Sequence, residues 1–281
     1  DNPAPDGAEP IISDGRKPLS ISHYYQRLGQ RVVNAMTALT GEGRLYEVDM
    51  RLRPFGNAGP LSVSLESFAS YQRESSWTWE HLALTRARVV SADAEFAVQI
   101  DTDIQTALAV ERSEEDLLLA VAEMRERMAR ENGSDNPWSI KHVRGGLVDC
   151  EFIAQYLQLR HAHDDPEILH TGTSTAFVRL RDAGFLETVI ADELINATCL
   201  WRRLQGLLRL TLEGSHDPED FPTALKQKLA QAAEVESYEA VDTLVRETAA
   251  RIYILFNQII ADPAQAIAAA PGEQPDGDYN T

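Results

Sequence analysis

The chain has 281 residues, a formal net charge of −18 at pH 7 and 43% hydrophobic residues. This hydrophobic content supports a sizeable core, so we expect a globular protein of one large domain or two ordinary ones. The negative charge argues against nucleic acid and anionic membranes as general partners, because phosphate groups would be repelled over most of the surface. The sequence has neither an apolar run of the ~18 residues that indicate a membrane span nor a signal-peptide pattern, so we expect a cytoplasmic protein.

The two ends of the chain have compositions that are typical of flexible segments. Residues 1–19 are rich in Pro, Asp and Gly, and residues 263–281 are rich in Ala, Pro, Gly and Asp. We predict a flexible lead and a flexible tail there. The chain also lacks an initiator methionine, so we expect it to be a segment of a longer protein. Cys150 and Cys199 lie in apolar helical patterns, and we expect both to be buried and reduced.

The first part of the chain mixes helix and strand signals. Apolar residues recur at helical spacing over 20–39, which predicts an amphipathic helix that ends before Gly41 and Gly43. Further signals predict a strand over 46–54, short helices over 67–73 and 79–85, and a strand over 87–90.

From about residue 94 onward, strand signals vanish and helical periodicity takes over. Short Gly, Pro and Asp connections separate these segments, which predicts an antiparallel helical bundle. We therefore expect an α+β chain that is mostly α. The predicted helices cover 114–130, 147–162, 174–183, 190–212, 221–233 and 237–260.

The predicted strand over 46–54 carries an unusual set of charges. Alternation places Glu47, Asp49, Arg51 and Arg53 on one face, opposite the apolar residues of the same strand. Carboxylates on a rigid strand can hold Mg²⁺, and nearby arginines can bind the phosphate oxygens that the metal bridges. A solvated face of ion pairs explains the same residues, so the strand alone leaves both interpretations open.

Several motifs in order narrow this choice. The strand is followed by Gly56-Asn57-Ala58-Gly59-Pro60-Leu61, Trp77-Thr78-Trp79-Glu80-His81, Leu84 to Val90, and Gly145 to Arg160. Over roughly residues 20–260 this order resembles the glutamine synthetase adenylyltransferase family, two-headed enzymes that attach AMP to glutamine synthetase and remove it. The sequence of residues 77–81 is similar to that of the carboxyl-terminal half of these enzymes, which is the adenylylating half. The resemblance implies that 20–95 is the last part of a nucleotidyltransferase-type α/β domain and that 96–262 is a helical bundle domain.

The resemblance also implies a site and its cofactors, ATP and Mg²⁺. Asp49 is implied as the third catalytic carboxylate, which helps hold the Mg²⁺ that activates a tyrosine hydroxyl of glutamine synthetase for attack on the α-phosphorus of ATP. Glu47 is a candidate second metal ligand or a partner of Arg53. Arg51 and Arg53 are candidate triphosphate contacts, with ion pairs as the alternative. Lys141 is a candidate phosphate contact, because the resemblance places its segment near the active cleft.

One departure from the family pattern bears on activity. No Gly-Ser followed by Asp-x-Asp precedes Asp49, and Asp101-Thr102-Asp103 follows it in a helical context. We therefore expect the chain alone to be inactive. Two alternatives remain: the adenylyl-removing half of the same enzyme, or a non-catalytic helical module that binds glutamine synthetase or a nitrogen-regulatory signalling protein. Effector sites and the oligomeric state leave no motif.

Two other polar groups have structural interpretations. Asp149 and Glu151 fall at the start of a predicted helix, where acidic side chains favour the helix dipole. His161, His163 and His170 lie close to Asp164 and Asp165, but histidines two residues apart do not share a helix face, so we interpret this group as a solvated helix end.

Overall fold

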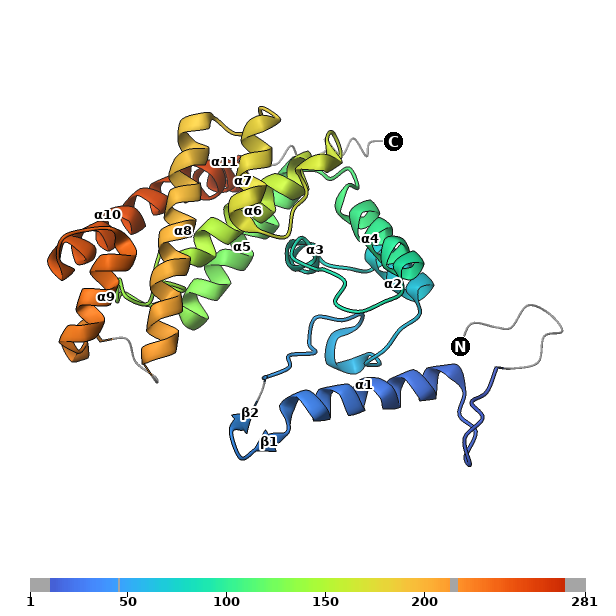
Figure 1. Cartoon of the computed structure of the whole chain (residues 1–281). Helices are drawn as coiled ribbons and strands as arrows, with labels where there is room; N and C mark the ends of the chain where they lie inside the picture. The colour runs from blue at the N-terminus through green and yellow to red at the C-terminus, as the bar shows by residue number, and fades with distance from the viewer. Residues whose placement is uncertain (1–10, 45, 213–216, 271–281) are drawn as a thin grey trace, which may run out of the picture. The chain divides into compact units, whose positions relative to one another are not determined.

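The computed structural model describes residues 11–44, 46–212 and 217–270. The chain forms two compact units, Asp1–Ser76 (unit 1) and Trp77–Thr281 (unit 2). Most of the described residues are helical, which confirms the prediction of a mostly α chain, and Figure 1 shows the helices in chain order from blue to red. The one sheet among the described residues consists of two short antiparallel strands.

Unit 1 begins with a helix and a hairpin. Its elements are α1 (Ile21–Thr37), β1 (Leu39–Thr40), β2 (Gly43–Arg44), the 3₁₀-helix η1 (Gly56–Ala58) and α2 (Leu65–Glu74). The hairpin follows directly after α1, and Gly43, which adopts φ of +100°, pairs with Thr40 in it. The helix predicted over 20–39 is therefore confirmed, and the hairpin was not predicted.

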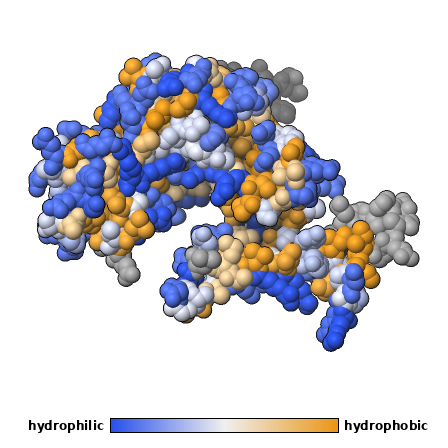
Figure 2. Space-filling view, viewed as in Figure 1, coloured by the Kyte–Doolittle hydropathy of each residue, from blue (hydrophilic) through white to orange (hydrophobic). Residues whose placement is uncertain are grey.

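The apolar side of α1 is unusually open. None of its residues is buried, and five large apolar side chains along it are 44% to 53% exposed. These residues are Ile21, Tyr24, Tyr25, Leu28 and Val32. Figure 2 shows hydrophobic residues at the surface of this part of the chain. The described residues of unit 1 thus leave the amphipathic face of α1 largely uncovered.

Both strands that we predicted from alternation are wrong. Residues 46–54 run as irregular chain and turns, and residues 87–90 form no strand either. A strand needs ladder hydrogen bonds to a neighbour, and the described residues provide neither segment with one. The backbone N–H of Tyr46 donates to the Met36 carbonyl near the end of α1, at 3.2 Å, and the Tyr46 side chain is exposed.

Unit 2 is built from helices, and the helices predicted there are confirmed. The α-helices are α3 (Thr78–Leu84), α4 (Ala94–Leu108), α5 (Glu114–Asn132), α6 (Leu147–His161), α7 (Thr173–Asp182), α8 (Thr188–Thr211), α9 (Thr223–Ala233), α10 (Tyr238–Phe256) and α11 (Asp262–Ala269). Short 3₁₀-helices η2 (Pro166–Ile168) and η3 (Pro218–Asp220) lie in the connections. A π-helical turn, η4 (Asn257–Ala261), joins α10 to α11.

Helix α6 forms the centre of unit 2. It is buried on nearly every side, and it packs against α3, α5, α7, α8 and α10. A helix with apolar residues all round is typical of such a central position. Its amino-terminal end therefore lies among helices that come from distant parts of the sequence.

The helical part of the chain continues past residue 262, where we predicted the start of the tail. Residues 262–269 form α11, which packs against α5 and buries Ala264. Pro263 falls in the first turn, where proline favours a helix, and several alanines follow. The flexibility of the tail stays a prediction, although 262–269 is helical, and residues 271–281 lie outside the described residues.

The structure bears only in part on the predicted flexible lead and on the predicted domain boundary. Residues 1–10 lie outside the described residues, and Ile12 forms an isolated bridge with Ser20. The compact units meet at 76/77, whereas the sequence places a domain boundary at 95/96, which stays a prediction. None of the described helices is long and apolar enough to span a membrane.

Candidate functional site

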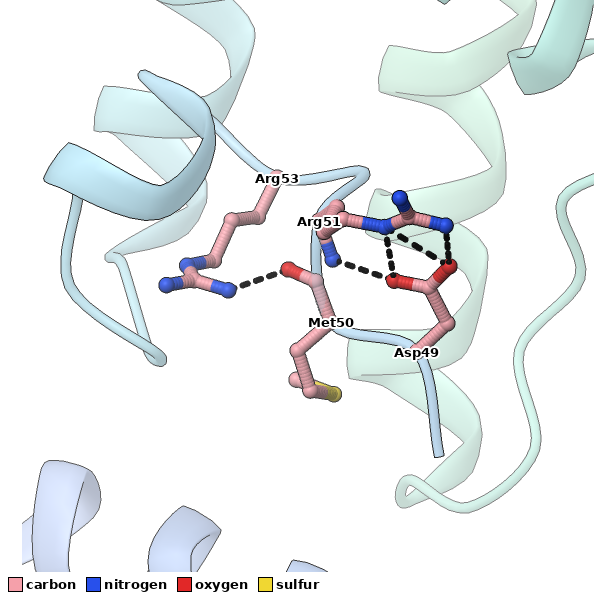
Figure 3. Close-up of polar contacts among 4 residues, drawn as sticks. All are labelled: Asp49, Met50, Arg51 and Arg53. Carbon is pink, nitrogen blue, oxygen red and sulfur yellow. Dashed lines mark hydrogen bonds and ion pairs between the residues drawn. The ribbon is translucent and has the colours of Figure 1, made fainter. Parts of the chain in front are cut away.

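The segment around Asp49 folds onto itself. The Asp49 carboxylate accepts the backbone N–H of Arg51 at 3.0 Å, which makes an Asx-type turn. The Arg51 guanidinium donates to the same carboxylate through Nε at 3.0 Å and Nη2 at 2.6 Å. Figure 3 shows the backbone N–H and the guanidinium of Arg51 directed at the Asp49 carboxylate. The Arg53 guanidinium is directed away from it. Asp49 and Arg51 are thus an ion pair, as the structural alternative predicted.

This pairing sets the protonation state of Asp49. Hydrogen bonds from the Arg51 side chain, followed by the Arg51 backbone N–H, lower the pKa of the Asp49 carboxyl to about 2. The Asp49 side chain is 59% exposed and carries its charge throughout the physiological pH range. An exposed ion pair adds little stability, so Asp49 can exchange Arg51 for another cation at small cost.

Arg53 holds the loop that follows. Its guanidinium donates to the carbonyl oxygens of Met50 and, at 3.3 Å, of Gly59. The predicted pairing of Glu47 with Arg53 is therefore wrong, and Glu47 instead faces Arg44 at 3.4 Å. Without a strand, alternation no longer places these charged side chains on one face.

Glu47 and Asp49 are suitable oxygen donors for Mg²⁺, since both carboxylates are exposed. They do not form a complete site. Across residues 11–44, 46–212 and 217–270, no group of three or more His, Cys, Asp or Glu side chains is placed to hold a metal ion. These two residues therefore fit the part of a metal site that one segment can contribute.

Lys141 belongs to unit 2, in the loop between α5 and α6. Its side chain is exposed and forms no ion pair within the part of the chain that the structure describes. Burial lowers the pKa of the neighbouring His142, and the charges of Lys141 and Arg125 lower it further. Lys141 is thus an exposed cation in a chain that is acidic overall.

The acidic residues at the start of α6 are structural, as predicted, but their partners were not foreseen. Asp149 forms a buried ion pair with Arg125 of α5, and Glu151 forms a partly exposed ion pair with Arg86 at 2.5 Å. A signal for Arg125 was present in the sequence. It follows Leu117 and Val121 at intervals of four, so it lies on the apolar stripe of its helix.

The histidine group contains no metal site within the described residues. His161 stacks on Phe185, with ring centroids 4.3 Å apart, and the His163 ring lies 3.3 Å from the carbonyl oxygen of Ala109.

The expectation that both cysteines are buried is confirmed for one of them. Both are free thiols and Cys150 is buried, but Cys199 is exposed because it falls on the outer side of α8.

Comparison with known proteins identifies the two parts of the chain separately. Residues 5–103 match the family model of glutamate-ammonia ligase adenylyltransferase. Residues 93–260 match the family model described as GlnD PII-uridylyltransferase. Both models are nucleotidyltransferase families by name, and they overlap over 93–103.

Single relatives match almost the whole chain. It is 41% identical over 253 residues to the bifunctional glutamine synthetase adenylyltransferase/adenylyl-removing enzyme of Xanthobacter autotrophicus, which covers 90% of this chain and 26% of that protein. The proteins of the same description from Rhodopseudomonas palustris (strain TIE-1) and Bradyrhizobium diazoefficiens are also 41% identical, over 88% and 91% of this chain and 25% and 26% of theirs. The chain thus spans about a quarter of the length of these curated relatives. It belongs to the glutamine synthetase adenylyltransferase/adenylyl-removing enzyme family.

Proposed function

We propose that this chain is part of an ATP-dependent protein adenylyltransferase that modifies a tyrosine of glutamine synthetase and thereby regulates nitrogen assimilation in the cytoplasm. The observation that carries the proposal is the 41% identity over 253 residues to an enzyme of that description. Residues 20–95 are the last part of the nucleotidyltransferase domain, and 96–262 are its helical domain. In the reaction, the tyrosine oxygen bonds to the α-phosphorus of ATP, the tyrosine proton is lost and pyrophosphate leaves.

Asp49 is the catalytic residue of this segment in the proposal. Its low pKa and its exposure support a role as a metal ligand, with Glu47 as a second oxygen donor. Mg²⁺ held there would neutralise phosphate charge and activate the attacking hydroxyl. A metal ion on Asp49 would take the place of Arg51, whose guanidinium could then contact the triphosphate, and Arg53 remains a second candidate contact.

The test is Asp49→Asn in the complete enzyme. The change removes the ligand charge but keeps the shape, so adenylylation should fall by a factor of about 10²–10³. The control is Asp101→Asn in α4, which belongs to the unrelated Asp101-Thr102-Asp103 sequence and should leave the rate unchanged. Both are measured as transfer of labelled AMP to glutamine synthetase.

Two results would contradict the proposal. A wild-type rate for Asp49→Asn would remove Asp49 from the reaction, and a loss with Asp101→Asn would mean that the metal site was assigned to the wrong segment. The isolated chain should transfer no AMP in the same assay, because Asp49 has no partner carboxylates from a Gly-Ser and Asp-x-Asp motif.

The family match of residues 93–260 suggests what unit 2 contributes to the proposed reaction. The helical unit matches a family model named for uridylyl transfer, and it also lies within the match to a relative named for adenylyl transfer. What adenylyl and uridylyl transfer have in common is the triphosphate, whereas the base and the protein substrate differ. The match therefore supports a contact between unit 2 and the phosphate chain, for which Lys141 is the candidate.

Two alternatives differ in their outcomes. The adenylyl-removing reaction, on the same fold, uses phosphate and adenylylated glutamine synthetase, so the complete enzyme would release ADP through the half that contains Asp49. A binding module without chemistry is supported by the family model named for PII, a signalling protein. Under that reading, calorimetry would detect binding of PII or of glutamine synthetase to the chain, and Asp49→Asn would leave the activity of the complete enzyme intact.

A further inference from the structure

The loop that carries Lys141 is tied to the first turn of α6. The carbonyl oxygens of Ile140 and Lys141 accept hydrogen bonds from the N–H groups of Leu147 and Val148, at 2.9 and 3.3 Å. These N–H groups are therefore already satisfied, so the dipole end of α6 is not an open anion site. These two N–H groups are therefore not available to an anion, and a side chain of the loop is the better candidate for such a contact.

A buried carboxylate ties the same loop to a second helix. Asp149 is fully buried, and its two oxygens accept hydrogen bonds from the backbone N–H of Gly145 and from Nε of Arg125. Arg125 is 2% exposed, and its Nη2 has no partner among the described residues. The Asp149 carboxylate thus links the loop, α6 and α5 at a single point.

The third attachment is steric. Gly145 has φ of +77°, and a Cβ atom at this position would lie 1.7 Å from the carbonyl oxygen of Ala249 in α10. Only glycine allows this approach. The loop is therefore fixed against α5, α6 and α10.

Packing of the loop against the helices does not by itself require the buried Arg125–Asp149 ion pair. Burying an ion pair is unfavourable unless its geometry is very good, and apolar side chains of similar volume often replace such pairs without loss of stability. What apolar residues cannot provide is an acceptor for the Gly145 N–H. The pair therefore fixes the loop position, and the exposed Lys141 side chain is the cation that the loop presents.

We propose that Asp149, in its buried pair with Arg125, is a positioning residue that holds the loop so that Lys141 contacts the phosphate chain of a nucleoside triphosphate. The inference rests on the proposed function and deepens it. Lys141 is the contacting residue, Asp149 acts through the Gly145 N–H, and Arg125 is the buried hydrogen-bond partner of the Asp149 carboxylate. A preorganised lysine binds phosphate without first losing the freedom of its backbone.

The first test measures binding of inorganic tripolyphosphate to the 281-residue chain by calorimetry at low ionic strength, where an exposed cation is not screened. Lys141→Ala should weaken binding by about tenfold, as expected for the loss of one hydrogen bond to a charged group. Lys228→Ala, an exposed lysine of α9, is the matched control and should not change the affinity. Absence of saturable binding to the unchanged chain, or equal losses for both variants, would overturn the proposal.

The second test separates position from stability with two double variants that both lack the buried charges. Arg125→Met with Asp149→Asn keeps an oxygen acceptor for Gly145 and should bind tripolyphosphate within about threefold of the original affinity. Arg125→Met with Asp149→Leu removes the acceptor and should lose about as much affinity as Lys141→Ala, with a comparable thermal transition. Equal affinities for the two folded double variants would show that the tie to Gly145 does not position Lys141.

The proposed function and this inference fail separately. Tripolyphosphate binding to the chain needs neither Asp49 nor glutamine synthetase. Loss of binding in Lys141→Ala together with normal transfer in Asp49→Asn would remove the proposed catalytic carboxylate and keep the loop. Normal binding in Lys141→Ala together with a dead Asp49→Asn enzyme would do the reverse.

Discussion

At the scale of single residues, burial decides which polar groups can react. Burial raises the pKa of the Cys150 thiol to about 12, although a hydrogen bond with Thr198 opposes the shift. The thiolate is the nucleophilic form, so Cys150 is inert in the folded chain. Asp49 is the opposite case, since it is exposed and its pKa is lowered to about 2 by Arg51.

The two cysteines provide a direct measurement of this difference. A thiol reagent such as Ellman's reagent should label one cysteine of the native chain rapidly, because Cys199 is exposed and Cys150 is buried. After unfolding, both should react. The variant Cys199→Ser is the control and should leave no rapidly reacting thiol. Rapid reaction of two thiols in the native chain would contradict the assigned burial of Cys150.

The Asp49–Arg51 pair stabilises the folded chain only within a defined pH range. Because the folded pKa of Asp49 lies below its usual value of 3.8, the contribution of the pair is present above that value and is lost as the pH falls towards 2. Above pH 4 the carboxylate is fully charged. Changes in activity between pH 5 and 8 must therefore come from groups other than Asp49.

At the scale of elements, the sequence predicted helices well and strands badly. Helices such as α5 and α8 are specified by an apolar stripe that is local to the segment, so periodicity finds them. The strand predicted at 46–54 depended on alternation, which says nothing about whether a pairing partner exists. For the candidate site, the residue types could be predicted, but the contacts of Glu47, Arg53 and Asp149 depend on chain folding that the pattern does not encode.

Two glycines of unit 2 test how local geometry supports the elements. Gly145→Ala should destabilise the chain by several kcal/mol, because φ is +77° and the added Cβ would meet the Ala249 carbonyl. Gly206→Ala should stabilise it by about 0.5–1 kcal/mol, because Gly206 lies within α8 and its Cβ would meet nothing within 4 Å. Chemical denaturation measures both. Equal effects of the two changes would contradict the constraint assigned to Gly145.

At the scale of the whole chain, the two units differ in how completely they bury their apolar residues. Unit 2 contains nearly all of the buried apolar side chains of the described residues, arranged around α6. In unit 1 only Tyr71 is buried among the large apolar side chains that the structure describes, and α1 buries none. Since burial of apolar surface is the main driving force of folding, stability should be concentrated in unit 2.

A pair of truncated chains tests this distribution. Residues 77–270 should fold alone with high helicity and one cooperative thermal transition, because their helices pack mostly on one another. Residues 1–76 should show no cooperative transition, because the isolated α1 buries too little apolar surface to offset the entropy of ordering. Circular dichroism with thermal melting measures both, and the 281-residue chain serves as the reference. A cooperative transition in 1–76 would show that unit 1 has a core of its own. Its absence in 77–270 would show that the helical unit does not fold independently.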